Sequence, residues 1–377
     1  MKPRTLLIYA FILSSSHVLS SPRILIDTCS FGKSFGVDTH WGVLVPHQEL
    51  LKPLQKGVIK SIELSYKLNR NKDKLWYSFY NHPEVGISYM FMDLGYSNVL
   101  GYSHSLYPYI NFSISPKDKL VWVSLRFASG ISYVTKVYDS ISNKQNLAIS
   151  SYLNLFAQLG VKFNFKIENR TEANVGLNGI HISNGVIKKP NYGLNIATMS
   201  CGVNFYFGEC YSNPKSIITP DITNNRWSII FAGAVKETGK PGGLRYGVGS
   251  LGLEYSRVTK TLLRIGTSLD YMYDGATFRR FEQESVQYKS RLKASKVGLT
   301  FMGEMSLDRL SAFANFGVYL YNFDKKDDPV YQRIGVRYRF NKIFYGQISL
   351  KTHLNVADYL EYGVILAIPS KKERPSI

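Results

Sequence analysis

The sequence predicts an all-β protein, a transmembrane antiparallel β-barrel of about 16 strands in two similar halves of eight strands each. Three observations predict this fold class. The N-terminus has the pattern of an export signal. No later segment has the roughly 20 consecutive apolar residues of a membrane-spanning helix. The rest of the chain alternates between strand-like segments rich in Tyr and Phe and short runs of turn residues.

The export signal occupies the first residues of the chain. Lys2 and Arg4 form a positive start, residues 6–13 are apolar, and a small and polar run covers 14–21. The apolar core is too short to cross a bilayer as a helix, so residues 1–21 are predicted to be a cleaved signal peptide. A secreted barrel of this kind is expected in the cell outer membrane.

Composition limits the partners. The chain has 46 Lys and Arg against 27 Asp and Glu, a formal net charge of +19, together with 27 Tyr and 21 Phe. Basic rims suit the phosphates of outer-membrane lipid, and aromatic residues suit the two membrane interfaces. Nucleic acid is not expected as a partner of an exported protein.

The three cysteines are too few for a disulfide framework. Cys29 and Cys210 are both expected near the periplasmic ends of strands, so we hypothesise that they pair.

Strands are predicted from period-two alternation bounded by turn residues. The segment 171–180 is a clear example, because Val175 and Leu177 face one side while Asn174 and Asn178 face the other. Such a strand has an apolar face for lipid and a polar face for the lumen. The first half contains eight predicted strands, at 34–45, 58–67, 84–94, 105–115, 120–135, 155–166, 171–182 and 194–207.

The second half resembles the first in its number of strands. We therefore divide the chain into a first barrel half at 22–210, a linker at 211–226, and a second half at 227–377 that ends in a short basic tail. The second half contains eight more predicted strands, at 227–236, 243–257, 262–273, 294–306, 311–322, 331–341, 343–353 and 359–368.

Sixteen strands can close as one barrel or as two. The linker and the aromatic end of a strand at Phe207 argue for two closures. Single large barrels are common in outer membranes, and we favour one continuous barrel.

The two halves also share a sequence pattern that indicates duplication. FAQLGVKFNF at 156–165 aligns with YQRIGVRYRF at 331–340, and a histidine follows in each half, His181 and His353. Asn355 stands where the second copy would need a serine, so we expect that copy to be inactive.

The stretch around His181 is the best candidate for chemistry. His181 and Ser183 are two residues apart, so on a strand they share a face with Cα atoms about 6–7 Å apart. A histidine there could accept the serine proton during attack on an ester. The turn at 188–190 returns the chain so that Asn195 lies opposite His181, where its amide could orient the imidazole.

A His-x-Ser pair on a strand is most often no more than two polar side chains on one face. The longer pattern is more specific, because H-x-S-N-[GA]-x-x-K-x-P-N-x-G-[IL] resembles the outer-membrane lipid A 3-O-deacylase family, also called acyloxyacyl hydrolases. The resemblance covers about residues 30–208 and leaves the second half outside it. Beyond the His–Ser pair, the matching positions are Asn184, Lys188, Pro190, Asn191 and Gly193.

The resemblance implies an activity and residue roles. His181 would be the general base, Ser183 the nucleophile, and Asn184 part of the oxyanion hole, acting on lipid A within lipopolysaccharide. The family pattern has a glutamate at the position of Asn195, so this chain departs from it at the third catalytic position. Glu172 and Asp139 are candidates for a substitute carboxylate.

Other polar residues have weaker assignments. The loop at 133–151 carries Asp139, Asn143 and Asn146, which could contact a sugar headgroup or simply cap the loop. His40 and His47 are expected to be structural, since neither clusters with metal-type ligands. No cofactor and no metal are expected.

We therefore expect a serine–histidine ester hydrolase that removes an acyl chain from lipid A or a related lipid. The alternative is a barrel without enzymatic activity, such as a porin, an adhesin scaffold or a lipid-binding protein.

Overall fold

The computed structural model describes residues 29–68, 75–117, 119–212, 225–237, 242–259, 263–283, 291–324, 327–354 and 356–369. The predicted signal peptide and most of the predicted linker lie outside the described residues. So do the side chains of Cys29 and Cys210, so their pairing stays a hypothesis.

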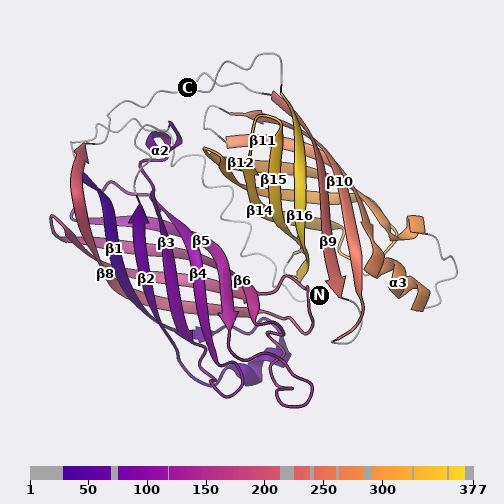
Figure 1. The fold of residues 1–377 in the computed structure, drawn as a ribbon, viewed down its shortest axis with the longest axis horizontal. Helices are drawn as coiled ribbons and strands as arrows, with labels where there is room; N and C mark the ends of the chain where they lie inside the picture. The colour runs from indigo at the N-terminus through magenta and orange to yellow at the C-terminus, as the bar shows by residue number, and fades with distance from the viewer. Residues whose placement is uncertain are drawn as a thin grey trace, which may run out of the picture.

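The first eight strands form one closed antiparallel barrel, on the left in Figure 1. Each strand is bonded to its neighbours in the chain, and β8 returns to β1. The elements are β1 (Cys29–Leu44), the 3-10 helix η1 (Glu49–Leu54), β2 (Ile59–Leu68), α2 (Leu75–Phe79), β3 (Glu84–Asp93), β4 (Tyr102–Ser113), β5 (Val121–Val134), β6 (Leu153–Glu168), β7 (Thr171–Ser183) and β8 (Leu194–Ser212).

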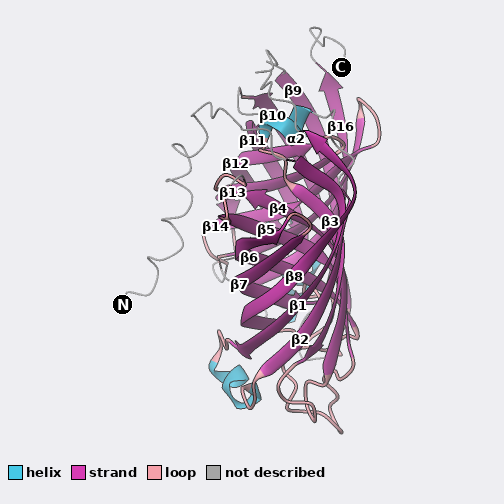
Figure 2. Cartoon of the chain, turned by 90° about the vertical axis from the view of Figure 1, so that its left-hand side faces the viewer, coloured by secondary structure: helices cyan, strands magenta, loops and turns pink. Residues whose placement is uncertain are grey.

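The last eight strands form a second closed barrel, in which β16 pairs with β9. Figure 2 shows the strands tilted relative to the long direction of the molecule, as closure of a sheet requires. The elements are β9 (Asn225–Glu237), β10 (Arg245–Val258), β11 (Leu263–Asp274), α3 (Gly275–Gln283), η2 (Arg291–Ala294), β12 (Ser295–Leu307), β13 (Leu310–Asn322), β14 (Val330–Arg339), β15 (Phe344–His353) and β16 (Val356–Pro369).

The sixteen predicted strands are all present, and the all-β barrel class with two eight-stranded halves is confirmed. The preference for one continuous barrel is wrong. β8 pairs with β1 along nearly its whole length, from Leu44 opposite Ile196 to Cys29 opposite Ser212. That ladder uses the free edge of β1, so β9 has no partner in the first barrel and closes the second with β16.

The aligned segments of the two halves occupy equivalent places. Residues 156–165 lie on β6, the sixth strand of the first barrel, and 331–340 begin on β14, the sixth strand of the second. His181 and His353 then lie on the seventh strand of each barrel, β7 and β15. The equivalent positions support the interpretation of a duplicated barrel.

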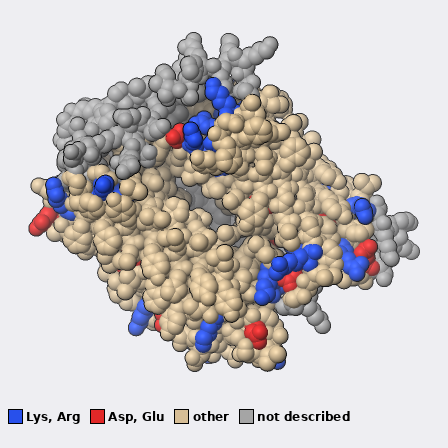
Figure 3. All heavy atoms as spheres, viewed as in Figure 1, with Lys and Arg blue, Asp and Glu red and all other residues tan. Residues whose placement is uncertain are grey.

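The outer walls are apolar and the interiors are polar. On β7, Val175 and Leu177 are exposed while Asn174 and Asn178 are buried in the interior. In Figure 3 the wall facing the viewer is largely free of charged side chains, which gather near the ends of the barrels. This is the arrangement a barrel needs to sit in lipid. Among the described residues, none of the helices combines the length and the apolar character needed to cross a bilayer.

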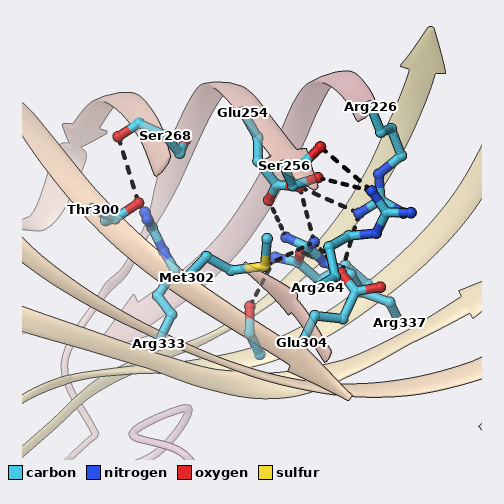
Figure 4. A network of polar contacts seen from close by, with 12 residues as sticks. Arg226, Glu254, Ser256, Arg264, Ser268, Thr300, Met302, Glu304, Arg333 and Arg337 are labelled. Atoms are coloured by element: carbon cyan, nitrogen blue, oxygen red, sulfur yellow. Dashed lines mark hydrogen bonds and ion pairs between the residues drawn. The ribbon is translucent and has the colours of Figure 1, made fainter. Parts of the chain in front are cut away.

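Buried ion pairs fill both interiors. In the first barrel Arg126 donates to Glu63, which also contacts His40 at 3.2 Å. In the second, Arg337 donates to Glu254 and to Glu304, at 2.7 Å each (Figure 4). The charges neutralise one another across the lumen, so these interiors are packed rather than open.

We predict that Glu254→Ala destabilises the second barrel by about 3 kcal/mol or more, because Arg337 and Arg226 would then share one buried carboxylate, Glu304. The midpoint of guanidinium unfolding followed by circular dichroism measures the change. The matched control is Leu253→Ala, since Leu253 is the neighbouring residue on the exposed face of β10. Equal midpoints for the two variants would contradict the role of the ion-pair network.

Candidate active site

His181 and Ser183 lie on the outer wall of the first barrel. They continue the outward-facing set of β7 that includes Val175 and Leu177, because alternate residues of a strand share a face. His181 is partly exposed, whereas Ser183 is covered by the neighbouring loops and is 5% exposed. The two side chains therefore face the lipid side of the wall near the end of a strand.

Three side chains form a linear hydrogen-bonded chain. The Ser183 Oγ lies 2.9 Å from His181 Nε2, and His181 Nδ1 lies 2.6 Å from Asn195 Oδ1. His181 and Asn195 are direct partners in the β7–β8 ladder, as the hairpin register predicts. The structure thus brings together the predicted nucleophile, the predicted base and the predicted orienting amide.

The connection between β7 and β8 is held by its own polar groups and by Ser150 from the loop before β6. The Lys188 carbonyl accepts a hydrogen bond from Asn184 Nδ2 at 2.9 Å and from Ser150 Oγ at 2.8 Å. The Asn191 side-chain oxygen accepts from the Asn184 backbone N–H at 3.1 Å. The motif residues around the His–Ser pair therefore shape the turn that follows it.

Gly193 is required beside the site for two reasons. Its φ is +76°, a left-handed conformation that suits glycine. A Cβ at this position would also lie 2.9 Å from His181 Cε1 and 3.3 Å from Ser183 Cβ. A side chain here would push against both residues of the pair.

The opposite face of the same strands is anchored in an apolar cluster. Ile180, Ile182, Leu194 and Ile196 alternate with the site residues and are 3% exposed or less. They pack inside the barrel with residues of β1, η1 and β3. Because this core is closely packed, it holds the backbone under His181, Ser183 and Asn195 in place.

Asn184 is already engaged in hydrogen bonds. Its Nδ2 lies within donor distance of Ser150 Oγ, Ser151 Oγ and the Lys188 carbonyl, and it is 4% exposed. An amide nitrogen has two hydrogens, so a role in the oxyanion hole requires one of these bonds to change partner.

The proposed substitute carboxylates are elsewhere. Glu172 lies at the far end of β7 and accepts a hydrogen bond from Tyr206, and Asp139 accepts from the backbone N–H groups of Ile141 and Ser142. Those two N–H groups also lower the pKa of Asp139. Neither carboxylate reaches His181, so Asn195 is the residue that contacts its Nδ1.

The loop asparagines have structural partners. Asn143 and Asn146 each donate to the Val99 carbonyl, and Asn146 is fully buried. They shape the loop that carries Ser150 and Ser151, as the capping interpretation expects.

The other predicted histidines face the interiors. His40 contacts Glu63 and Thr198, a structural role, as expected. His353 contacts the Tyr319 hydroxyl at 2.9 Å inside the second barrel, so the copy of His181 points away from lipid.

His47 was missed as a site residue. It follows β1 and its Nδ1 lies 2.9 Å from Asn195 Nδ2. Partial burial, and then the positive charge of His181 when protonated, lower the pKa of His47 from its ordinary value. The signal in the sequence was indirect, since closure of an eight-stranded barrel places the end of β1 beside the start of β8.

The second barrel touches the turn behind the site. The Lys189 backbone N–H donates to Glu237 at 2.6 Å, and Glu237, at the end of β9, is 1% exposed. A Cβ at Gly185 would lie 2.9 Å from the Cβ of Leu360 on β16, so the two barrels approach closely here.

Fold and site together define a membrane β-barrel with a hydrogen-bonded serine, histidine and asparagine on its outer wall. Comparison with known families identifies it further. The model described as "Lipid A 3-O-deacylase (PagL)" matches residues 60–204, and the model "Acyloxyacyl hydrolase, C-terminal domain" matches residues 225–369. The chain belongs to the lipid A 3-O-deacylase family.

Two solved structures each match about half of this chain. The outer membrane enzyme PagL is 19% identical over 46% of this chain and 99% of its own, with a TM-score of 0.31. Neisserial surface protein A (NspA) is 13% identical over 48% of this chain and 100% of its own, with a TM-score of 0.32. No curated protein sequence matches the chain.

Family membership establishes an ester hydrolase of the outer membrane that acts on lipid A. It also corrects one expectation from the sequence. The second half, which seemed to lie outside the family, matches the model of a C-terminal domain and is part of it.

We predict that Glu237→Ala speeds hydrogen exchange at the Lys189 amide by about tenfold or more, because this N–H loses its buried acceptor. Exchange followed by mass spectrometry on peptides covering 184–192 measures it. Glu237→Gln keeps an acceptor oxygen and should have a smaller effect, and Glu282→Ala on α3 is the control within the second barrel. Unchanged exchange in Glu237→Ala would show that the contact does not hold the turn.

Proposed function

We propose that Ser183 and His181 hydrolyse an acyl ester of lipid A by a covalent mechanism at the lipid-facing wall of the first barrel. The observation that carries this proposal is the hydrogen-bonded chain from Ser183 through His181 to Asn195. A nucleophile, a base and a group that orients the base lie in contact and in the order that acyl transfer requires.

In the first half of the reaction Ser183 Oγ attacks the ester carbonyl carbon and gives its proton to His181 Nε2. The carbonyl oxygen becomes an oxyanion, for which Asn184 is the proposed donor after exchanging one of its present partners. The tetrahedral intermediate then collapses, the bond to the alcohol oxygen breaks, and His181 returns the proton to that oxygen. The product is the alcohol, with the acyl group held as an ester on Ser183.

In the second half water replaces the alcohol. His181 takes a proton from water as its oxygen attacks the acyl carbon, and the new tetrahedral intermediate expels Ser183 Oγ, which regains the proton. A free fatty acid leaves and the resting state returns. The cycle uses no group beyond this chain, water and the ester.

The imidazolium formed in each half is stabilised only by a neutral amide. His181 Nδ1–H donates to Asn195 Oδ1 at 2.6 Å, which orients the ring. A carboxylate in this place would add charge stabilisation. The chemistry therefore depends on the geometry of this hydrogen bond more strongly than in a triad that ends in a carboxylate.

The outer wall leaves room for an acyl chain beside Ser183 and His181, at Gly179 and Ala197. Gly179 and Ala197 are direct neighbours on β7 and β8 and continue the outward face next to His181 and Asn195. No side chain approaches the space that a Cβ at Gly179 would occupy, where the nearest atom is a backbone oxygen at 4.0 Å. An acyl chain could enter along this strip from the membrane itself, without passing through the lumen.

The proposed orientation puts the site at the depth of lipid A. If β1 starts on the periplasmic side, the turn at 188–191 lies at the cell surface, beside the loops at 45–58 and 135–152. Long loops on the outside are usual for outer-membrane barrels. The pair would then lie near the outer leaflet, in which lipid A resides.

We predict that Ser183→Ala and His181→Ala each lower the deacylation rate by about a thousandfold or more, because each removes a group that acts as part of one unit. Fatty acid released from purified lipid A in detergent, followed by mass spectrometry, measures the rate. Thr39→Ala is the control, since it removes a hydroxyl from the outer wall of the same barrel. A Ser183→Ala protein with full activity would contradict the mechanism.

A bulky side chain placed in the strip should block acyl chains without disturbing the protein. Gly179→Leu is predicted to lower kcat/KM for lipid A by about tenfold or more, while hydrolysis of p-nitrophenyl acetate changes by less than about twofold. Gly249→Leu, also in open space on the wall of the second barrel, is the matched control. Equal losses on both substrates would mean that Gly179 supports the site and does not contact the acyl chain.

A further inference from the structure

We propose that His47 is a positioning residue that holds the Asn195 side chain with its oxygen toward His181. The inference rests on the proposed function and deepens it, because it explains how an amide works where the family pattern has a glutamate. It depends on one contact, the 2.9 Å separation between Asn195 Nδ2 and His47 Nδ1.

The orientation of the amide decides whether His181 can act as a base. With Oδ1 toward the ring, His181 Nδ1 carries the proton and donates it, which leaves a lone pair on Nε2 facing Ser183. With the amide turned over, Nδ2 would donate to Nδ1 and the proton would lie on Nε2. His181 in that tautomer cannot accept the serine proton.

A carboxylate does not have this problem, because both of its oxygens accept. An asparagine alone presents a donor and an acceptor of nearly equal size, and the wrong choice is costly. When an amide replaces the triad aspartate in a serine protease, turnover falls about 10⁴-fold because the histidine adopts the wrong tautomer. An active site with asparagine therefore needs a further group that distinguishes the two ends of the amide.

His47 supplies that distinction. With its proton on Nε2, a neutral His47 presents a lone pair on Nδ1 that accepts from Asn195 Nδ2, and this bond is lost if the amide turns over. The backbone keeps the two residues together, since the Val45 N–H donates to the Asn195 carbonyl at 2.7 Å. The pairing of β1 with β8 that closes the barrel thus places His47 Nδ1 beside the Asn195 side-chain amide.

His47 must be neutral to accept, and its surroundings favour the neutral form. The charge that acts on it is that of His181, while on the adjacent helix Glu49 and Lys52 pair with each other at 2.7 Å. Because its pKa lies below the ordinary value, His47 stays neutral at neutral pH and gains a proton only as the pH falls through that lowered pKa. Below it, Nδ1–H can no longer accept, and the preference for the active orientation is lost.

The test is a double-mutant cycle between His47 and Asn195. His47→Ala should lower kcat on lipid A about tenfold in the wild-type background, and by less than about twofold in an Asn195→Asp background, where either oxygen can accept. His47→Asp should restore most of the activity, because a carboxylate at this position only accepts and so keeps Asn195 Nδ2 turned toward it. Gln48→Ala, next to His47 and without a capping bond, is the control.

The pH profile separates this role from a merely structural one. In the wild type the gain of a proton by His47 should add a drop of about tenfold in kcat/KM at low pH, the size of the His47→Ala effect, to the loss that the mechanism itself causes. In His47→Asp the side chain at position 47 still accepts over this pH range, so the additional drop should be absent. A structural role would give both proteins profiles of the same shape.

The outcomes are distinct. Equal losses from His47→Ala in both backgrounds, or wild-type activity in His47→Ala, would overturn the positioning role while the serine–histidine mechanism stands. Full activity in Ser183→Ala would overturn the mechanism itself, whatever His47 does.

Discussion

The ladder between β1 and β8 is the constraint on which the rest of the molecule depends. It closes the first barrel at eight strands and so forces the following strands to build a second one. It also brings the end of β1 beside the start of β8, where Val45 bonds to the backbone of Asn195 and His47 to its side chain. Ser183 and His181 reach the same place along β7, the neighbour of β8 on its other side. The site is thus a product of closure, assembled from the β7–β8 hairpin and from the residues that follow the distant strand β1.

The inner and outer faces of the first barrel's wall carry different kinds of side chains. Inside, paired charges such as Arg126 with Glu63 fill the lumen, and an apolar cluster lies behind the site. Outside, the wall is apolar, and Ser183 and His181, the proposed catalytic pair, lie on the face toward lipid. This division suits an enzyme whose substrate is itself a membrane lipid, because the ester need not leave the bilayer to reach the serine. The second barrel adds a support, since Glu237 binds the backbone of the turn at Lys189. The second barrel matches the model of an acyloxyacyl hydrolase C-terminal domain.

Alternation along the chain was enough to predict every strand, because each wall residue has lipid on one side and the lumen on the other. The pairing of His181 with Asn195 was also predictable, since a hairpin fixes the register of its own two strands. The number of barrels could not be predicted, because strands alternate in the same way in one large barrel and in two small ones. His47 and Glu237 were missed because each acts across a contact between distant parts of the chain. The hydrogen bonds between Asn184 and the loop that carries Ser150 could not be predicted for the same reason.

The central claim is that Ser183 is a nucleophile activated on the outer wall. Labelling of the purified full-length protein with a fluorophosphonate, followed by tandem mass spectrometry of its peptides, tests it most directly, because the probe bonds only to an activated serine. The account predicts one modified residue, Ser183, with labelling slowed strongly in His181→Ala. Labelling of the wild type that spares Ser183, or that proceeds equally fast without His181, would contradict it.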